Sequence, residues 1–497
     1  MKLFSRSEKP SWAVSMIPFI VLIATLSVVI KLFGSDALNG GSQVALLLSS
    51  GVVVAISMIF YRIPWKDFES AIVENISSVG SAIIILFLIG AVAGSWMVSG
   101  VVPTMIYYGM KVIFPSIFLL ACCVICALVS LMTGSSWTTI ATVGVALIGI
   151  GTAQGYQTGW IAGAIISGAY FGDKVSPLSD TTVLASSSAG TPLFSHIRYM
   201  MLTTVPSFCI AAIVFLIVSL CHHTPDVETI SDFSNDLSDS FRISPWLFLV
   251  PVLTGVMIAR KVPAVITLFV AAVLAGIFAL IFQPHIVHSI ATGLSPDSFT
   301  NLSFTDGFKG LFITFYDRTA IDTGNAALNE LVSTRGMTGM LNTVFLIFCA
   351  VTFGGTLVGS GMLQSLTDLL TRYISRRVSI VSSTVGTGIF ANMITGDQYL
   401  SIILTSSLYK KLYKDRGYES RLLSRSVEDS ATVVSVLIPW NSCGMTQATV
   451  LKVATIEYLP YCLFNLISPL MSILMAAIGY RIVRHKPQQV PDVQQSA

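Results

Sequence analysis

Long apolar runs are the feature that most constrains how this chain can fold. A helix needs roughly 20 apolar residues to cross a lipid bilayer, and several stretches approach that length: Ala13–Leu32, Ser78–Val98, Ile197–Leu220, Val262–Phe282 and Tyr458–Tyr480. Only 11% of the 497 residues are charged, whereas soluble domains average about 25%. The sequence therefore predicts an all-α polytopic membrane protein that lies in a lipid bilayer.

Several other classes of protein are disfavoured. The formal net charge is +3 and the basic residues sit at span ends, so we expect no nucleic-acid partner. No G-x-x-x-x-G-K-[ST] phosphate loop is present, so energy must come from something other than ATP bound by this chain. The eight cysteines show no paired C-x-x-C spacing, and we expect neither a cofactor nor catalytic residues. These features favour a secondary transporter over a pump or an enzyme.

Charge also predicts the topology, because cytoplasmic loops are enriched in Lys and Arg. Basic residues cluster at both ends of the chain and in segments such as Arg62–Lys66 and Lys410–Arg425. Thr224–Ser240 is acidic and contains no Lys or Arg, so we place it outside the cell. Seven passes or pass-equivalents on each side of it would leave both termini in the cytoplasm. Some of these passes are expected to be arms of re-entrant hairpins.

The expected organisation is a sequence of segments with two transmembrane repeats. The segments are a cytoplasmic N-terminus (1–11), a first transmembrane repeat (12–222), an acidic outer loop (223–242), a second, inverted transmembrane repeat (243–483) and a cytoplasmic tail (484–497). Asp306–Gly339 mixes charged and apolar residues and receives no assignment. The oligomeric state stays open, with a homodimer among the alternatives.

The stretch Ser167–Ala185 places charge between apolar runs. It contains Asp173, Lys174 and Asp180, and Pro177 breaks any helix there. A charged side chain at membrane depth costs roughly 2.5–3.5 kcal/mol on insertion scales and marks a functional site by default. Helices that break among carboxylates and hydroxyls form ion sites in transporters.

Landmarks in the two halves recur at a nearly constant offset, which indicates an internal repeat. Gly94 and Ser99-Gly100 match residues 261 positions later, and Thr133-Gly134 and Pro177 match residues 262 positions later. An odd number of passes per half makes the copies face opposite ways. An inverted repeat of this kind places its substrate site near the bilayer midplane.

The repeat also aligns the polar breaks of the two halves. Asp397 aligns with Ser135, and Asp180 aligns with Ser442, so each half supplies a carboxylate where the other supplies a hydroxyl. We infer an asymmetric site that is assembled from two hairpin tips and two broken helices. Carboxylates, hydroxyls and freed carbonyls are the oxygen ligands of hard cations, and they suit both Na⁺ and H⁺.

Two motifs carry a resemblance to a known family. Gly172-Asp-Lys-Val-Ser-Pro-Leu-Ser-Asp-Thr-Thr182 and Tyr458-Leu-Pro-Tyr-Cys-Leu-Phe-Asn-Leu-Ile-Ser-Pro469 resemble the NhaC-type Na⁺/H⁺ antiporter family, over nearly the whole chain. The resemblance implies a bacterial inner-membrane antiporter that exports sodium for protons. It also implies membership in the ion transporter superfamily, with paired re-entrant hairpins and an elevator-like motion. The family includes members that look like sodium-linked malate/lactate exchangers.

Asp180 is the first candidate for the carboxylate that binds Na⁺ or H⁺, and Asp173 is the second. Asp180 has a simpler interpretation as a capping residue of a new helix. The simpler interpretation of Asp173 is an ion-pair partner of Lys174 or Arg198 at the cytoplasmic surface. We interpret Lys174 as a surface cation that orients the protein, not as a coupling residue.

The second half supplies the remaining acidic candidates. Asp397 is a candidate ligand, and its simpler interpretation is a solvated turn residue. Asp429, beside Glu428, is a candidate ligand, and its simpler interpretation is a charge at the N-terminus of a helix. Glu457 is a candidate for lining the ion pathway. The neutral candidates have interhelical hydrogen bonding as their alternative. They are Ser135, Ser136, Thr138, Ser179, Thr181, Asn392, Asn441 and Ser442.

The resulting hypothesis is a single site with alternating access, at which Na⁺ and H⁺ compete. The nearest alternative is an exchanger of small carboxylates that is coupled to sodium or protons. An intramembrane aspartyl protease is disfavoured, because Tyr170-Phe-Gly-Asp173 lacks the first glycine of a G-x-G-D segment. A passive channel is disfavoured by the paired helix breaks. The sequence does not choose among Na⁺, Li⁺ and K⁺.

Overall fold

The computed structural model is helical throughout the residues it describes, which are 10–33, 40–177, 179–222, 227–260, 262–294, 299, 301–321, 323, 328–329, 332–371 and 377–482. The β-structure within this part of the chain consists of an isolated bridge between Thr319 and Thr334. The predicted all-α fold is therefore confirmed. Most of the expected N-terminal segment (1–11) and the whole expected tail (484–497) lie outside the described residues.

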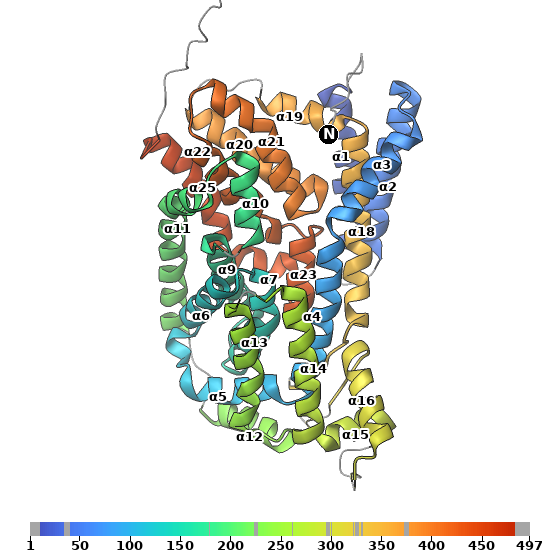
Figure 1. The fold of residues 1–497 in the computed structure, drawn as a ribbon, viewed down its shortest axis with the longest axis vertical. Coiled ribbons are helices and arrows are strands. Elements are labelled where there is room, and N and C mark those ends of the chain that lie inside the picture. Colours follow the sequence, from blue (N-terminus) through green and yellow to red (C-terminus); the bar gives the residue numbers. More distant parts are fainter. Residues whose placement is uncertain are drawn as a thin grey trace, which may run out of the picture.

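Helices follow one another along the whole described chain (Figure 1). Those of the first half are α1 (Trp12–Phe33), α2 (Gly41–Tyr61), α3 (Trp65–Ser78), α4 (Gly80–Val98), α5 (Val101–Val112), α6 (Phe118–Thr133), α7 (Ser136–Thr139), α8 (Val145–Ala153), α9 (Thr158–Val175), α10 (Asp180–Ala189) and α11 (Leu193–Cys221). A π-helical turn, Ile140–Gly144, joins α7 to α8.

The second half continues in the same way. Its helices are α12 (Val227–Ser240), α13 (Leu249–Ala259), α14 (Ala264–Phe282), α15 (Pro284–Thr292), α16 (Phe304–Tyr316), α18 (Leu341–Gly359), α19 (Met362–Thr371), α20 (Arg377–Thr395), α21 (Gln398–Asp415), α22 (Ser420–Val427), α23 (Ser442–Leu451), α24 (Thr455–Tyr458) and α25 (Leu463–Ile478). A second π-helical turn, Glu428–Thr432, follows α22.

Eight of these helices, counted over the described residues, are long and apolar enough to cross a membrane, or eleven if each bent helix pair counts as one span. The protein is therefore a multi-pass membrane protein. The expected total of fourteen passes also includes shorter and more polar helices, and it stays a prediction. The expected span Tyr458–Tyr480 is not one straight helix, because the chain bends by 56° between Thr455–Tyr461 and Leu463–Ile478.

The expected acidic loop contains a helix, α12, that lies at one end of the molecule (Figure 1). The start of α1 and helices α19 and α22 lie at the opposite end. This arrangement agrees with the separation of acidic and basic segments that the sequence predicts. Asp306–Gly339 is now partly assigned, since α16 covers its first residues and Thr319 pairs with Thr334.

The lengths of several helices agree with the predicted internal repeat. α4 and α18 each have 19 residues and begin 261 positions apart. α10 and α23 each have ten residues and begin 262 positions apart. Ser136–Ala153 and α21 each have 18 residues at the same offset. These lengths and offsets agree with the predicted repeat, and both the repeat and the opposite orientation of its two copies stay predictions.

The two halves interlock instead of forming separate bodies. α18, from the second half, packs against α2 and α3. α10, from the first half, packs against α21 and α22, and α23 packs against the π-helical turn Ile140–Gly144. The two short helices α10 and α23, which follow the proline breaks, therefore each contact the other half of the chain.

Glycines permit the closest helix contacts. A Cβ atom at Gly168 of α9 would lie 2.1 Å from the carbonyl oxygen of Cys123 in α6, and one at Gly172 would lie 2.3 Å from that of Ala127. Gly355, a landmark of the repeat, meets the backbone of Ile72 in the same way. The repeat glycine Gly355 therefore serves helix packing, as small residues do between membrane helices.

We expect Gly168→Val to destabilise the protein, because α6 and α9 would have to move apart. Overpacking of this kind costs roughly 1–3 kcal/mol, and we expect a loss of at least that size. The matched control is Gly386→Val in α20, where an added Cβ meets nothing within 4 Å. Thermal unfolding in detergent measures both variants. Equal midpoints for the two variants would contradict the tight α6–α9 contact.

Candidate functional site

Four helices begin at the polar breaks, and a side chain caps each of them. Ser135 accepts a hydrogen bond from the backbone N–H of Thr138, and Asp397 accepts one from Leu400. The caps of the two helices after the proline breaks are Ser179 of α10 and Asn441 of α23. Capping satisfies N–H groups that have no partner at the start of a helix.

The two Thr-Gly turns before α7 and α21 have the same hydrogen bonds. Thr133 Oγ1 donates to the carbonyl of Ser135 over 3.2 Å and accepts from its N–H over 3.2 Å. Thr395 Oγ1 makes the same two contacts with Asp397, over 2.9 and 3.2 Å. Thr133 and Thr395 therefore make equivalent hydrogen bonds with Ser135 and Asp397, which agrees with the alignment of these two residues.

Asp173 lies at the C-terminal end of α9 and faces the hairpin tip of its own half. Its Oδ2 accepts from the Oγ of Ser136 over 2.7 Å and from the backbone N–H of Ser136 over 3.1 Å. The residue is 5% exposed, and its Oδ1 has no hydrogen-bond donor within the described part of the chain. A buried carboxylate oxygen without a donor is expensive, so Asp173 suits a bound proton or cation.

The alternative interpretation of Asp180 as a helix cap is wrong. The cap of α10 is Ser179, and Asp180 is the first residue of the helix. Asp180 is exposed, and its Oδ2 accepts a hydrogen bond from Tyr399 Oη over 2.7 Å. Tyr399 belongs to α21, so this contact joins the broken helix of the first half to the hairpin of the second.

Asp397 is 1% exposed, which excludes its interpretation as a solvated turn residue. Its second oxygen, Oδ2, accepts from Ser442 Oγ over 3.3 Å. Asn441 Nδ2 donates to Asn392 Oδ1 over 3.1 Å. The structure therefore brings together the expected residues Asp397, Ser442, Asn441 and Asn392 around the second half's break.

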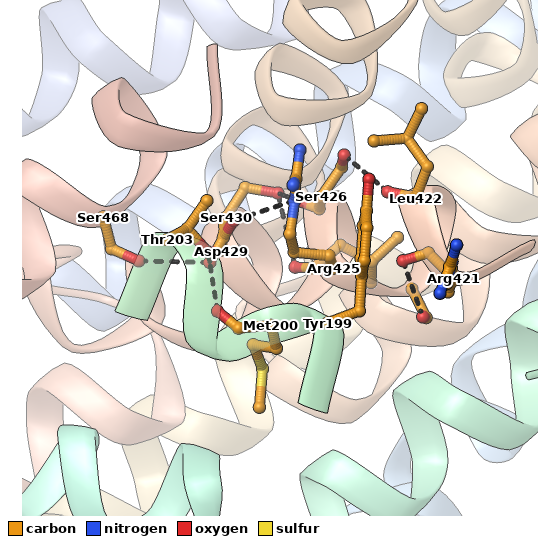
Figure 2. Close-up of polar contacts among 12 residues, drawn as sticks. Tyr199, Met200, Thr203, Arg421, Leu422, Arg425, Ser426, Asp429, Ser430 and Ser468 are labelled. Carbon is orange, nitrogen blue, oxygen red and sulfur yellow. Dashed lines mark hydrogen bonds and ion pairs between the residues drawn. The ribbon is translucent and has the colours of Figure 1, made fainter. Parts of the chain in front are cut away.

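An ion pair between the two halves lies beside these breaks. Lys174 Nζ contacts Asp429 Oδ1, and both side chains are fully buried. Asp429 Oδ1 also accepts from Thr203 Oγ1 over 3.1 Å and from Ser468 Oγ over 3.3 Å (Figure 2). Lys174 donates to Ser468 as well, over 3.0 Å. The structure thus supplies hydrogen bonds to both charges, which buried ions require.

Two expectations are wrong as a result. Lys174 is not a surface cation, and it does not pair with Asp173, because it reaches across to Asp429 of the other half. Glu428 and Asp429 do not begin a helix, since they lie in the π-helical turn that continues α22. The sequence does not show burial directly, and this partner lies 255 positions away.

Arg425 was assigned to a basic surface segment, but its side chain is 0% exposed. Its Nε lies 3.9 Å from Asp429 Oδ2, and its guanidinium lies 4.8 Å from the ring centroid of Tyr199. None of its nitrogens has a hydrogen-bond acceptor among the described residues. The spacing of Arg425 and Asp429, four residues apart in one helical stretch, is the sequence signal that indicates their shared face.

Glu428 is a buried carboxylate without a hydrogen-bond donor among the described residues. It is 0% exposed, and neither carboxylate oxygen has a donor in the part of the chain that the structure describes. An isolated buried carboxylate charge is strongly unfavourable, and such a group neutralises instead. Glu428 therefore suits a bound proton in this conformation.

Side-chain amides satisfy the irregular backbone around the second π-helical turn. Asn392 Nδ2 donates to the carbonyl of Ala431 over 2.6 Å, and Gln398 Nε2 donates to that of Thr432 over 3.3 Å. Asn465 Nδ2 donates to the carbonyl of Val433 over 2.8 Å. The C-terminal motif Tyr458–Pro469 therefore has a structural role that the sequence alone did not show.

The described residues contain no group of three or more His, Cys, Asp or Glu that could hold a metal ion.

We expect Lys174→Met to destabilise the protein by about 3–5 kcal/mol, because it leaves Asp429 as an uncompensated buried charge. The double variant Lys174→Met/Asp429→Asn removes both charges and should recover most of this loss. Lys411→Met, at an exposed lysine, is the control. Thermal unfolding in detergent measures all three, and a single variant as stable as the control would contradict the importance of the pair.

Comparisons with known proteins show the family of this chain. The family model described as "Na+/H+ antiporter family" matches residues 11–190 and 168–480. The Na(+)/H(+) antiporter NhaC of Alkalihalophilus pseudofirmus is 36% identical over 86% of this chain and 88% of its own length. NhaC of Bacillus subtilis is 34% identical over 87% and 91%, and the Malate-2H(+)/Na(+)-lactate antiporter of Bacillus subtilis is 35% identical over 84% and 85%. This chain therefore belongs to the Na⁺/H⁺ antiporter family.

Proposed function

We propose that this protein exports Na⁺ in exchange for H⁺ across the bacterial inner membrane, with both termini in the cytoplasm. The observation that carries the proposal is Asp173, a buried carboxylate with one oxygen held by Ser136 and the other without a donor. A carboxylate in this state binds either a proton or a cation, because each removes the cost of its uncompensated charge. The NhaC relatives support the choice of ions.

Asp180 gives the ions access to this position. It is exposed, whereas Asp173 and Asp397 are buried, so a hydrated ion can reach Asp180 first. The hydroxyls of Ser179 and Thr181 lie beside it, 2.9 Å from each other. We propose that the ion passes from Asp180 toward Asp173 and loses its water to these oxygens.

The second half completes the proposed site. Asp397, Ser442, Asn441 and Asn392 form a hydrogen-bonded group at its break. Asp429 forms an ion pair with Lys174 in this conformation. It would therefore bind the transported ion only after that ion pair separates. In alternating access, protonation of the free carboxylates releases Na⁺ on one side, and loss of the proton restores its binding on the other.

We expect Asp173→Asn and Asp180→Asn each to lower Na⁺-dependent H⁺ movement by roughly 10- to 100-fold, the range seen when a group that supports a metal ion is removed. Everted vesicles with a pH-sensitive dye measure this directly as fluorescence dequenching upon Na⁺ addition. Asp239→Asn, at an exposed position of α12, is the control. An Asp173→Asn variant that exchanges Na⁺ and H⁺ like the control would overturn the proposed site.

A second function, exchange of small carboxylates, has one specific observation in its favour. Arg425 presents a fully buried guanidinium with no acceptor among the described side chains. Guanidinium groups bind carboxylates through two parallel hydrogen bonds. The malate/lactate relative supports this alternative.

If the protein carries a small carboxylate, vesicles should take up labelled malate or lactate, and Arg425→Gln should reduce that uptake about tenfold or more, as expected for a lost hydrogen bond to a charged group. Arg421→Gln, four residues earlier in α22, is the matched control. Na⁺/H⁺ exchange is measured in the same vesicles. Vesicles that exchange Na⁺ for H⁺ but take up neither acid would exclude this second function.

A further inference from the structure

A basic cavity lies outside the ion site, against the first turns of α11. Its volume is about 290 Å³, and its wall contains three arginines, Arg198, Arg421 and Arg481. They come from α11, from α22 and from the segment after α25, three elements that pack against one another in the fold. Residues from distant parts of the sequence therefore place three cations around one space.

One carboxylate offsets part of this charge. Glu419 contacts Arg421 in an ion pair that is partly exposed, which leaves Arg198 and Arg481 as the remaining cations. α11 also begins at the cavity without a side-chain cap, and its first turn lines the wall. The positive end of this 29-residue helix adds to the attraction for an anion.

The wall is apolar as well as basic. Phe194 is 72% exposed and lies beside the arginines, and Leu202 continues the apolar side along α11. Tyr199 forms the base, and its ring lies between Arg421 and the buried Arg425 (Figure 2), 4.8 Å from each guanidinium. A ligand that fits both parts has an anionic head and an apolar tail.

We propose that this cavity binds the phosphodiester of an anionic phospholipid. The arginines would hold the phosphate oxygens, and Phe194 and Leu202 would contact the acyl chains. Basic pockets between membrane helices recognise lipid head groups in this way. A free phosphate ion would satisfy the arginines but would leave the apolar side without a partner. The inference does not depend on which ion the protein transports.

The test uses the purified full chain in a neutral detergent. Native mass spectrometry measures the binding of phosphatidylglycerol, phosphatidylcholine and inorganic phosphate. We expect phosphatidylglycerol to bind at least about tenfold more tightly than phosphatidylcholine. Arg198→Gln and Arg481→Gln should each weaken phosphatidylglycerol binding about fivefold, since one arginine near a membrane surface contributes about that factor.

Arg260→Gln, at an exposed arginine after α13, is the matched control and should bind phosphatidylglycerol like the wild type. Two variants keep the test valid if one of them fails to fold, which size-exclusion chromatography reports. Equal affinity of the cavity variants and the control for phosphatidylglycerol would overturn the proposal. Inorganic phosphate that binds as tightly as phosphatidylglycerol would show a site for soluble anions and would overturn it as well.

Discussion

The rest of the structure depends on one constraint, which is that a helix that begins inside a membrane must satisfy its own first N–H groups. Water does not reach the bilayer core, and each unpaired backbone group there costs several kcal/mol. Ser135, Ser179, Asp397 and Asn441 meet this requirement at the four breaks. Capping therefore explains why hydroxyls, amides and carboxylates are concentrated at the breaks.

The buried pair of Lys174 and Asp429 adds a second constraint, because it joins α9 of the first half to the π-helical turn of the second. Separating two buried charges is costly unless new partners replace them. Any motion that moves these elements apart must therefore move the pair together or bring a substitute for one charge. Under the proposed alternating access, a cation at Asp429 would be such a substitute for the charge of Lys174.

The sequence predicted the membrane class and the helix breaks because these depend on local composition and spacing. The Thr-Gly turns and the caps at Ser179 and Asn441 follow from residue types that favour these conformations. The burial of Lys174 and Arg425 was missed because it depends on partners such as Asp429, Tyr199 and Ser468, which are distant in sequence. A charged residue close to an apolar run either lies at the membrane surface or is buried in an ion pair. Only the packing of the other half of the chain decides which of the two occurs.

The remaining asymmetry of the two halves indicates how the site is divided. At matched positions one half has Ser135 and Asp180, whereas the other has Asp397 and Ser442. Asp397 is fully hydrogen-bonded as a cap, with Leu400 and Ser442 as its donors. Asp173 and Glu428 retain oxygens without donors among the described residues. The caps therefore pair the first backbone N–H groups of these helices. A bound proton or cation would offset the cost of a buried charge on Asp173 or Glu428.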